Sequence, residues 1–167
     1  TIAGSCPQER TINRTWTATD GCGNSSTCLQ TIIVDDSVPP VITCPANVTI
    51  ECTASTLPPA TGTATATDNC AGNPLVEFSD AILSGECPSL ETITRTWIAS
   101  DGCGNSSTCV QIIIVTDATV PVITCPANVT IQCTASTLPP NTGSATATDN
   151  CDSAPLVNFT DVSVGGI

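Results

Sequence analysis

Twelve cysteines carry the most obvious chemistry of this chain. The first six, between positions 6 and 70, each have a counterpart 81 positions later. None belongs to a CxxC pair and the chain contains no histidine, so the pattern indicates disulfide bonds rather than a zinc site. Because disulfides persist in oxidising compartments, we expect an extracellular, secreted protein. The two sets are Cys6, Cys22, Cys28, Cys44, Cys52 and Cys70, and then Cys87, Cys103, Cys109, Cys125, Cys133 and Cys151.

Acidic and amide side chains close to the cysteines form a second set of candidate ligands. The phrase TWIASDGCGNSSTC (96–109) contains two of them and repeats TWTATDGCGNSSTC (15–28). Carboxylate and amide oxygens are the ligands that calcium prefers, so we expect calcium at the junctions between repeats and no other cofactor. The alternative is that these side chains form Asx turns by accepting hydrogen bonds from nearby backbone amides. The expected ligands are Asp36, Asp68, Asp101, Asn105, Asp117 and Asp149.

No catalytic arrangement is visible in the sequence. Histidine is absent, the cysteines belong to the disulfide pattern, and no serine has a base beside it. Paired carboxylates could in principle hydrolyse a glycosidic bond, but with 2% aromatic residues the chain has little material for a surrounding apolar pocket. We therefore expect no enzymatic activity.

The charge and the apolar pattern exclude two classes of partner. A net charge of −12 repels phosphate backbones, so we expect no nucleic-acid partner. No apolar run is long enough to cross a bilayer, so we expect no membrane span in this segment. The N-terminus does not read as a signal peptide, and any export signal or anchor is expected outside these residues.

The sequence is an 81-residue tandem repeat, and the strands predicted for one period are the elements that position these side chains. Landmarks other than cysteine keep the register, since PVITCPANVTI recurs from Pro40 and from Pro121. Short runs of alternating Val, Ile and Thr, separated by Pro, Gly, Asn and Asp, predict an all-β fold with one wet face on its sheets. The expected strands of one period span 46–52, 61–68, 74–79, 91–100 and 108–115, with one or two weak strands near 81–84.

Tryptophan is the expected anchor of a thin core. A period of about 80 residues with so few aromatics buries little apolar surface, and small domains of this kind commonly need covalent staples. Trp97, with its counterpart Trp16, shares a strand face with Ile93, Ala99 and Arg95. The arginine must then either pair with a carboxylate or lie over the indole ring, and the sequence leaves both open.

The order of these phrases resembles a known family. PPVITCPANVTI, followed by ATATDNC and TRTWIASDGCGNSSTC, is similar to the hyalin (HYR) repeat and, more closely, to its cysteine-rich relatives in large secreted bacterial surface proteins. The resemblance covers essentially the whole chain. It implies tandem immunoglobulin-like β-sandwich modules that serve adhesion or act as spacers, without catalysis. Simpler hyalin repeats carry only the pair that matches Cys44 and Cys109, whereas this chain has six cysteines per period.

The family boundary predicts three segments. One complete module runs over 37–117, residues 1–36 are the C-terminal half of a preceding module, and residues 118–167 are the N-terminal half of the next. Two explanations remain open at this point. The 167 residues belong to a longer repetitive polypeptide, which we favour, or neighbouring copies complete each other's half-modules.

The resemblance also implies a disulfide pairing. In the family's strand arrangement the first strand runs parallel to the last, which gathers Cys52 and Cys87 at one end of the module and implies that they pair. The family pattern joins Cys44 to Cys109, and this leaves Cys70 with Cys103. By the same rule, Cys6, Cys22 and Cys28 are expected to bond to copies of Cys133, Cys151 and Cys125 in a preceding segment.

The last strand of the period predicts self-association. In CVQIIIV (109–115) both faces are apolar, so the outer face of Val110, Ile112 and Ile114 needs a cover. That cover is either a loop or linker of the same chain, or the next module or a neighbouring chain.

Taken together, these patterns predict a non-catalytic structural or adhesive repeat protein that builds an elongated, disulfide-stapled fibre or stalk on the cell surface. Its expected partners are its own copies, with surface glycans or host surfaces as further candidates. The alternative is a glycan- or partner-binding adhesin module in which the repeat itself carries the ligand site. The near-identity of the loops favours the structural role, because a recognition surface needs to be specialised at only one place.

Overall fold

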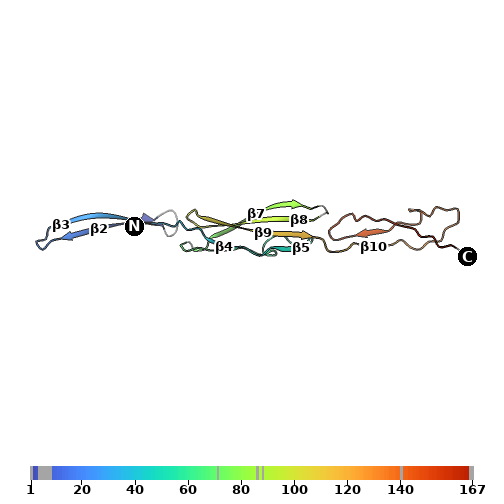
Figure 1. Ribbon diagram of the computed structural model, residues 1–167, viewed down its shortest axis with the longest axis horizontal. Helices are drawn as coiled ribbons and strands as arrows, with labels where there is room; N and C mark the ends of the chain where they lie inside the picture. The colour runs from blue at the N-terminus through green and yellow to red at the C-terminus, as the bar shows by residue number, and fades with distance from the viewer. Residues whose placement is uncertain are drawn as a thin grey trace. The chain divides into compact units, whose positions relative to one another are not determined.

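The computed structural model describes residues 2–3, 9–70, 72–85, 87, 89–139 and 141–165. These residues form eleven strands and no helix (Figure 1), so the predicted all-β fold is confirmed and no described helix could cross a membrane. The strands are β1 (Ile2–Ala3), β2 (Arg10–Thr19), β3 (Ser25–Val34), β4 (Val41–Thr43), β5 (Val48–Glu51), β6 (Thr65–Thr67), β7 (Leu75–Ser84), β8 (Glu91–Ser100), β9 (Ser106–Thr116), β10 (Val122–Thr124) and β11 (Thr146–Thr148).

The strands form four small sheets. One has the order β1-β2-β3 and contains a long antiparallel hairpin, in which Arg10 lies opposite Val34 and Thr19 opposite Ser25. The largest has the order β5-β9-β8-β7, and the two others are the pairs β4-β6 and β10-β11. Strands β10 and β11 lie 81 positions after β4 and β6, at matching positions of the sequence repeat.

Strand boundaries follow the sequence pattern best where the alternation is longest. The strand expected at 91–100 is confirmed as β8, and that expected at 108–115 is slightly extended as β9. The strand expected at 61–68 shrinks to β6 because Gly62 adopts a φ of 94° in a turn. A Cβ at that glycine would lie 2.7 Å from Pro45, so only glycine fits there. The segments expected at 74–79 and 81–84 form the single strand β7, and β4 was not expected.

Contacts between residues divide the chain into two compact units. The first comprises Thr1–Val48, Thr56–Ile82 and Ile93–Ile113. The second comprises Thr49–Ser55, Leu83–Thr92 and Ile114–Ile167. The predicted module boundaries at 36/37 and 117/118 fall inside these units and stay a prediction.

The core of the first unit lies on one face of β8 and β9. Alternate residues of β8, at positions 93, 95, 97 and 99, are at most 2% exposed. On β9, Gln111 and Ile113 are fully buried. This strict alternation is what a strand with one buried face requires.

Arg95 satisfies both interpretations of its position. Its Nε donates to Asp80 Oδ1 at 2.8 Å and its Nη2 to Asp80 Oδ2 at 2.8 Å, which makes a bidentate ion pair. The guanidinium also lies 4.4 Å from the Phe78 ring centroid and 5.8 Å from that of Trp97. A fully buried charge is tolerated here because Asp80 is its counter-ion and also accepts two of its hydrogen bonds.

Gln111 is a core residue that the sequence pattern did not single out. Trp97 Nε1 donates to its Oε1 at 3.3 Å, and its Nε2 donates to the backbone oxygens of Ala46 (2.9 Å) and Thr61 (2.6 Å). A buried amide needs such partners for both of its ends. Gln111 therefore ties β9 to the two segments that cover it.

The counterparts of these side chains on the β2–β3 hairpin are uncovered. Trp16 is 55% exposed, whereas Trp97 is 2% exposed. The local contacts are nevertheless alike, because Trp16 Nε1 donates to Gln30 Oε1 at 3.0 Å and the Arg14 guanidinium lies 5.5 Å from the indole centroid. The hairpin thus presents the side chains of a core face without a covering layer among the described residues.

The outer face of β9 is also open among the described residues. Val110 is 54% exposed, Ile114 is 42% exposed, and Ile112 is partly buried. Asn47 Oδ1 accepts a hydrogen bond from the Ile112 backbone amide at 2.8 Å, at the start of this face. The predicted packing of this face against another module or chain stays a prediction.

Candidate functional site: a disulfide junction between repeats

Two disulfides have both partners among the described residues. Cys44–Cys109 confirms the family-based prediction, with Cα atoms 5.9 Å apart. It connects the segment after β4 to β9 within the first unit. This bond lies inside one period of the repeat and closes a core that contains few aromatic side chains.

The second disulfide, Cys52–Cys151, overturns the predicted pair Cys52–Cys87. Its Cα atoms are also 5.9 Å apart, but its sequence separation of 99 exceeds the 81-residue period. Cys87 carries an exposed free thiol instead. The prediction failed because it considered only partners of Cys52 within one module. The actual partner, Cys151, belongs to the following repeat.

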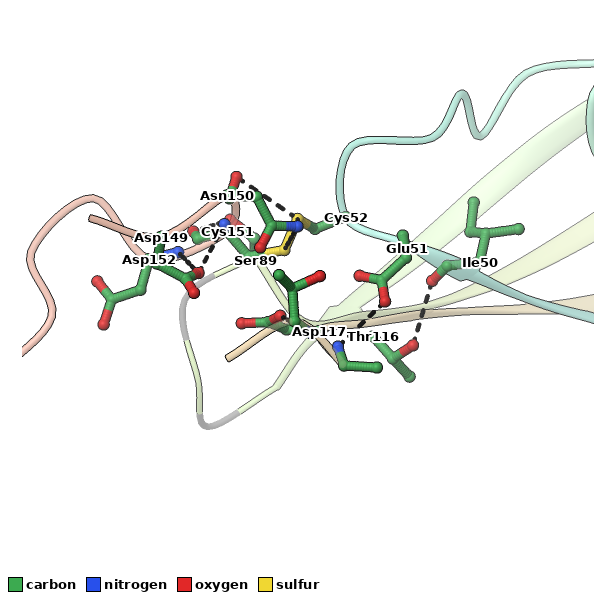
Figure 2. The surroundings of a disulfide bond; sticks show 12 residues. Ile50, Glu51, Cys52, Ser89, Thr116, Asp117, Asp149, Asn150, Cys151 and Asp152 are labelled. Carbon is green, nitrogen blue, oxygen red and sulfur yellow. Dashed lines mark hydrogen bonds between the residues drawn. A yellow bond between two sulfur atoms is a disulfide. The ribbon is translucent and has the colours of Figure 1, made fainter. Parts of the chain in front are cut away.

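Local hydrogen bonds hold Cys52 at the end of β5. Its amide donates to the Thr116 backbone oxygen at 2.9 Å, and Thr116 Oγ1 donates to the Ile50 backbone oxygen at 3.3 Å. Glu51 Oε1 accepts from the Ala118 amide at 3.2 Å, so the linker that leaves β9 is held beside β5 (Figure 2). These contacts hold residues 116–118 beside the end of β5.

Cys151 sits in a turn that its own sequence builds. Asp149 Oδ1 accepts hydrogen bonds from the Cys151 and Asp152 amides, each at 2.9 Å. These amides lower the pKa of the Asp149 carboxyl, the bond from Asp152 most of all. Ser89 Oγ donates to the Cys151 backbone oxygen at 3.1 Å, so the loop between β7 and β8 contacts the turn as well (Figure 2). Sequence analysis missed this role of Ser89, which no motif marks.

The predicted pair Cys70–Cys103 is also wrong. Cys103 is disulfide-bonded, but Cys70 keeps a free thiol. The repeat gives the reason, because Cys70 is the counterpart of Cys151 81 positions earlier. Cys151 bonds to Cys52, 99 positions before it, and the position that lies 99 before Cys70 is outside the 167 residues.

Acidic side chains surround the Cys70 thiol. Burial, and then the charges of Asp36 and Asp68 with a smaller contribution from Asp101, raise its pKa. The Cys70 amide donates to Asp68 Oδ1 at 2.8 Å, which holds the residue in this position. Because the thiolate is the reactive form, the raised pKa slows but does not prevent thiol–disulfide exchange at Cys70.

The remaining free cysteines are exposed, and they are Cys22, Cys28, Cys87, Cys125 and Cys133. The expected bond of Cys28 to a copy of Cys125 follows the confirmed Cys44–Cys109 rule and stays a prediction. The expected bond of Cys22 to a copy of Cys151 used the Cys70–Cys103 rule and is therefore withdrawn. Cys6 lies outside the described residues.

Four of the six expected calcium ligands fall into two groups, one in each unit, whereas Asp68 and Asn105 belong to neither group. Carboxylate oxygens of Asp36 and Asp101 lie within 4.8 Å of each other and of the Cys103 sulfur, and those of Asp117 and Asp149 lie within 4.8 Å of each other and of the Cys151 sulfur. Asp36 is only 6% exposed. Calcium binding by these groups stays a prediction.

The hydrogen bonds of Asp101 are those of an Asx turn. Its Oδ1 accepts from the Cys103 amide (2.8 Å) and the Asn105 amide (2.9 Å), and its Oδ2 accepts from Asn105 Nδ2 (2.8 Å). Burial pushes the pKa of Asp101 upward, but these hydrogen bonds outweigh it and the pKa is lowered. Asn105 Nδ2 also donates to the Asp36 backbone oxygen at 3.0 Å, so its amide braces the turn against the linker before β4.

Comparison with family models, curated proteins and solved structures found no match. The resemblance to the hyalin repeat therefore depends on the sequence motifs. The geometry defines an all-β, disulfide-bonded protein in which one bond crosses from one repeat to the next. Disulfides of this kind are typical of an oxidising compartment.

Proposed function

We propose that this chain is a structural repeat segment of an extracellular fibre or stalk, built from hyalin-like, immunoglobulin-like modules. The Cys52–Cys151 bond carries the proposal, because it joins residues that belong to successive repeats. A closed loop of this length constrains the unfolded chain by about 4–5 kcal/mol. A bond placed across a junction therefore stabilises the junction itself as well as the fold on either side.

The composition supports a structural role. The core is small, and the chain compensates with disulfides and a buried ion pair rather than with aromatic packing. The net charge of −12 keeps an extended surface soluble, while specific contacts between copies have to come from particular residues. The partner of this chain is thus its own repeat, and no catalytic step is part of the proposal.

Immunogold electron microscopy on unpermeabilised cells that produce the protein tests this function. Antibodies raised against the oxidised chain are expected to label filaments outside the cell, and peptide mapping of shed, non-reduced filaments is expected to recover the Cys52–Cys151 link. Labelling confined to the cell interior, or filaments that lack this link, would refute the proposal. A matched culture exposed to reductant controls for the dependence of the filaments on disulfides.

The adhesin alternative makes a different prediction. A ligand site carried by the repeat would give saturable binding of the isolated, oxidised chain to a defined glycan on an array. The structural proposal expects no such binding, so a specific glycan hit would favour the alternative.

A further inference from the structure

An open groove lies in the second unit, in the segment that follows β9. Its volume is ≈ 520 Å³, and its walls come from β10, from the loop before β11 and from the last described stretch of the chain. The wall residues include Cys125, Thr142, Phe159 and Asp161. Phe159 is 60% exposed, so an apolar side chain stands open beside a carboxylate.

The first unit shows what such a groove holds when it is filled. The counterparts of these wall residues, 81 positions earlier, are Cys44, Thr61, Phe78 and Asp80. Cys44 bonds to β9, Phe78 contacts Trp97 with ring centroids 5.3 Å apart, and Asp80 pairs with Arg95. The backbone oxygen of Thr61 accepts a hydrogen bond from Gln111. The filled groove therefore receives an arginine, a tryptophan and a glutamine from a two-stranded segment.

The β2–β3 hairpin presents the same three side chains without a groove. Arg14, Trp16 and Gln30 are the counterparts of Arg95, Trp97 and Gln111. The Arg14–Trp16 and Trp16–Gln30 contacts are already formed within the hairpin. An insert that is organised before docking loses less conformational entropy when it binds.

We propose that the β2–β3 hairpin of one copy of this chain docks into the 123–161 groove of a second copy, so that copies assemble head to tail. The internal repeat assigns the contacts. Arg14 pairs with Asp161 of the second copy, Trp16 packs against Phe159 of that copy, and Gln30 Nε2 donates to its Thr142 backbone oxygen. This deepens the proposed fibre function by naming the partner and the surface.

Charge makes this pairing selective. The chain contains three arginines and no lysine, against fifteen acidic residues. Two copies therefore repel each other over most orientations. The docked orientation places one of the few cations against a carboxylate, as Arg95 and Asp80 show within one copy.

The free cysteines provide an independent observation. Applying the Cys44–Cys109 geometry to the docked copies joins Cys28 of the hairpin to Cys125 of the groove. Applying the Cys52–Cys151 geometry joins Cys133 of the groove copy to Cys70 of the hairpin copy. The two remaining free thiols, Cys22 of the hairpin copy and Cys87 of the groove copy, then form the third pair. All six free thiols are used once.

In the docked pair, a second copy supplies the partners of these bonds. The observed inter-repeat bond joins Cys52 to a cysteine that follows it in the next repeat. The equivalent bond of Cys133 needs a cysteine of the same type in a following repeat, and the Cys70 of a docked copy supplies it. In each bond two thiols lose two protons and two electrons to a small-molecule disulfide such as oxidised glutathione, which leaves as two thiols.

Three variants of the full chain test the docking. Trp16→Asp disables the hairpin, and Ala145→Trp fills the groove, since Ala145 lines it and its counterpart Ala64 is 4% exposed. Thr17→Asp is the matched control, because Thr17 lies on the opposite face of β2 and is exposed. Light scattering after oxidation in glutathione buffer reports the size of the assemblies.

The unmodified chain and Thr17→Asp are expected to form oligomers of increasing size. Trp16→Asp and Ala145→Trp are each expected to stay single chains. Their mixture is expected to stop at pairs, since it contains one working groove and one working hairpin that complement each other. Single chains for the unmodified protein, or unrestricted growth of either variant, would overturn the proposal.

Isotope labelling gives a second readout on the unmodified chain. A mixture of ¹⁴N and ¹⁵N chains is expected to yield light–heavy hybrids of the Cys28–Cys125 peptide. Cys28–Cys125 peptides without hybrids would mean that the hairpin closes on its own chain, and other pairings would mean that the register is wrong; both overturn the proposal. A variant that lacks Cys44–Cys109 in its map is misfolded, and the isotope map then decides alone.

The outcome is separable from that of the proposed function. Copies that assemble in solution while the antibodies find no extracellular filament would refute the fibre function and leave the docking intact. Labelled filaments without the Cys28–Cys125 link would refute the docking and leave the fibre function intact.

Discussion

At the scale of single residues, Arg95 shows how a core with few aromatic side chains is held together. Its guanidinium donates to both Asp80 oxygens, to Thr61 Oγ1 at 2.9 Å and to the Thr56 backbone oxygen at 2.9 Å. The stem and the planar head also cover the Phe78 ring. One side chain thus combines apolar packing with hydrogen bonds to three residues, at the cost of burying a charge.

Removing either partner of this ion pair is expected to give unequal losses. Asp80→Ala leaves a fully buried guanidinium without its counter-charge and should lower the free energy of unfolding by about 3–5 kcal/mol. Arg95→Met leaves a carboxylate that is 22% exposed and can hydrate, so the loss should be about 1–3 kcal/mol. Urea unfolding of the oxidised single chain measures both.

Arg10→Met is the control for this comparison, because Arg10 is exposed and its loss should change the free energy of unfolding by less than about 0.5 kcal/mol. Equal losses for the two core variants, or a larger loss for Arg95→Met, would show that the burial of the guanidinium does not dominate the energetics.

At the scale of elements, the sequence predicts a strand correctly where its own alternation determines the structure. The prediction fails where contact with a distant segment determines it. Strand β8 follows from its own alternation, and its four inward positions are buried. The segment 61–64 has the same alternation, but Gly62 and the close approach of Pro45 turn it out of the strand. The alternation of apolar and polar residues indicates which face of a strand is buried. It does not indicate where another segment of the chain approaches the strand.

The same limit applies to the disulfides. Cys44–Cys109 was predicted from the resemblance to the hyalin repeat, because strand order alone left four cysteines at that end of the module. Cys52–Cys151 was missed because the prediction treated each module as closed, although the repeat itself places a cysteine of the next module in reach. Calcium binding by the acidic residues beside the cysteines stays a prediction, whereas the turn hydrogen bonds of Asp101 follow from the Asp-x-Cys-x-Asn spacing.

The turn between β8 and β9 should make stability depend on acid. Since hydrogen bonds lower the folded pKa of Asp101 below its usual 3.8, its contribution is complete above that value and is lost as the pH falls through the folded pKa. Asp101→Asn should therefore be less stable than the unmodified chain at pH about 6, and the difference should shrink as the pH falls through the lowered folded pKa of Asp101.

Urea midpoints across this pH range measure the effect. Asp35→Asn, at an exposed position before the linker, is the control and should follow the unmodified chain. A gap between Asp101→Asn and the unmodified chain that stays constant down to the lowest pH would mean that the carboxylate form of Asp101 does not hold the turn.

At the scale of the whole molecule, the calcium hypothesis concerns the places where repeats join. Calcium is expected to raise the melting temperature of the oxidised chain, with half the effect at about 0.1–1 mM, the range of extracellular modules. Asp117→Asn should weaken the response because Asp117 lies beside Asp149 at the junction. Differential scanning calorimetry with and without a chelator measures it.

Asp152→Asn is the matched control for calcium, since Asp152 accepts a local turn hydrogen bond from the Ala154 amide and lies outside both acidic groups. A melting temperature that changes neither with calcium nor with chelator would rule out calcium binding. The formation of Asx turns would then be the function of these carboxylates.

The long sequence separation of the Cys52–Cys151 bond affects how the protein responds to proteolysis. A protease that cuts any peptide bond between these two residues produces two fragments that remain one covalent molecule. If the same bond recurs with every 81-residue period, each loop overlaps the next, because its span of 99 is longer than the period. No single nick can then sever the polymer, and damage has to accumulate twice within one loop before anything is lost.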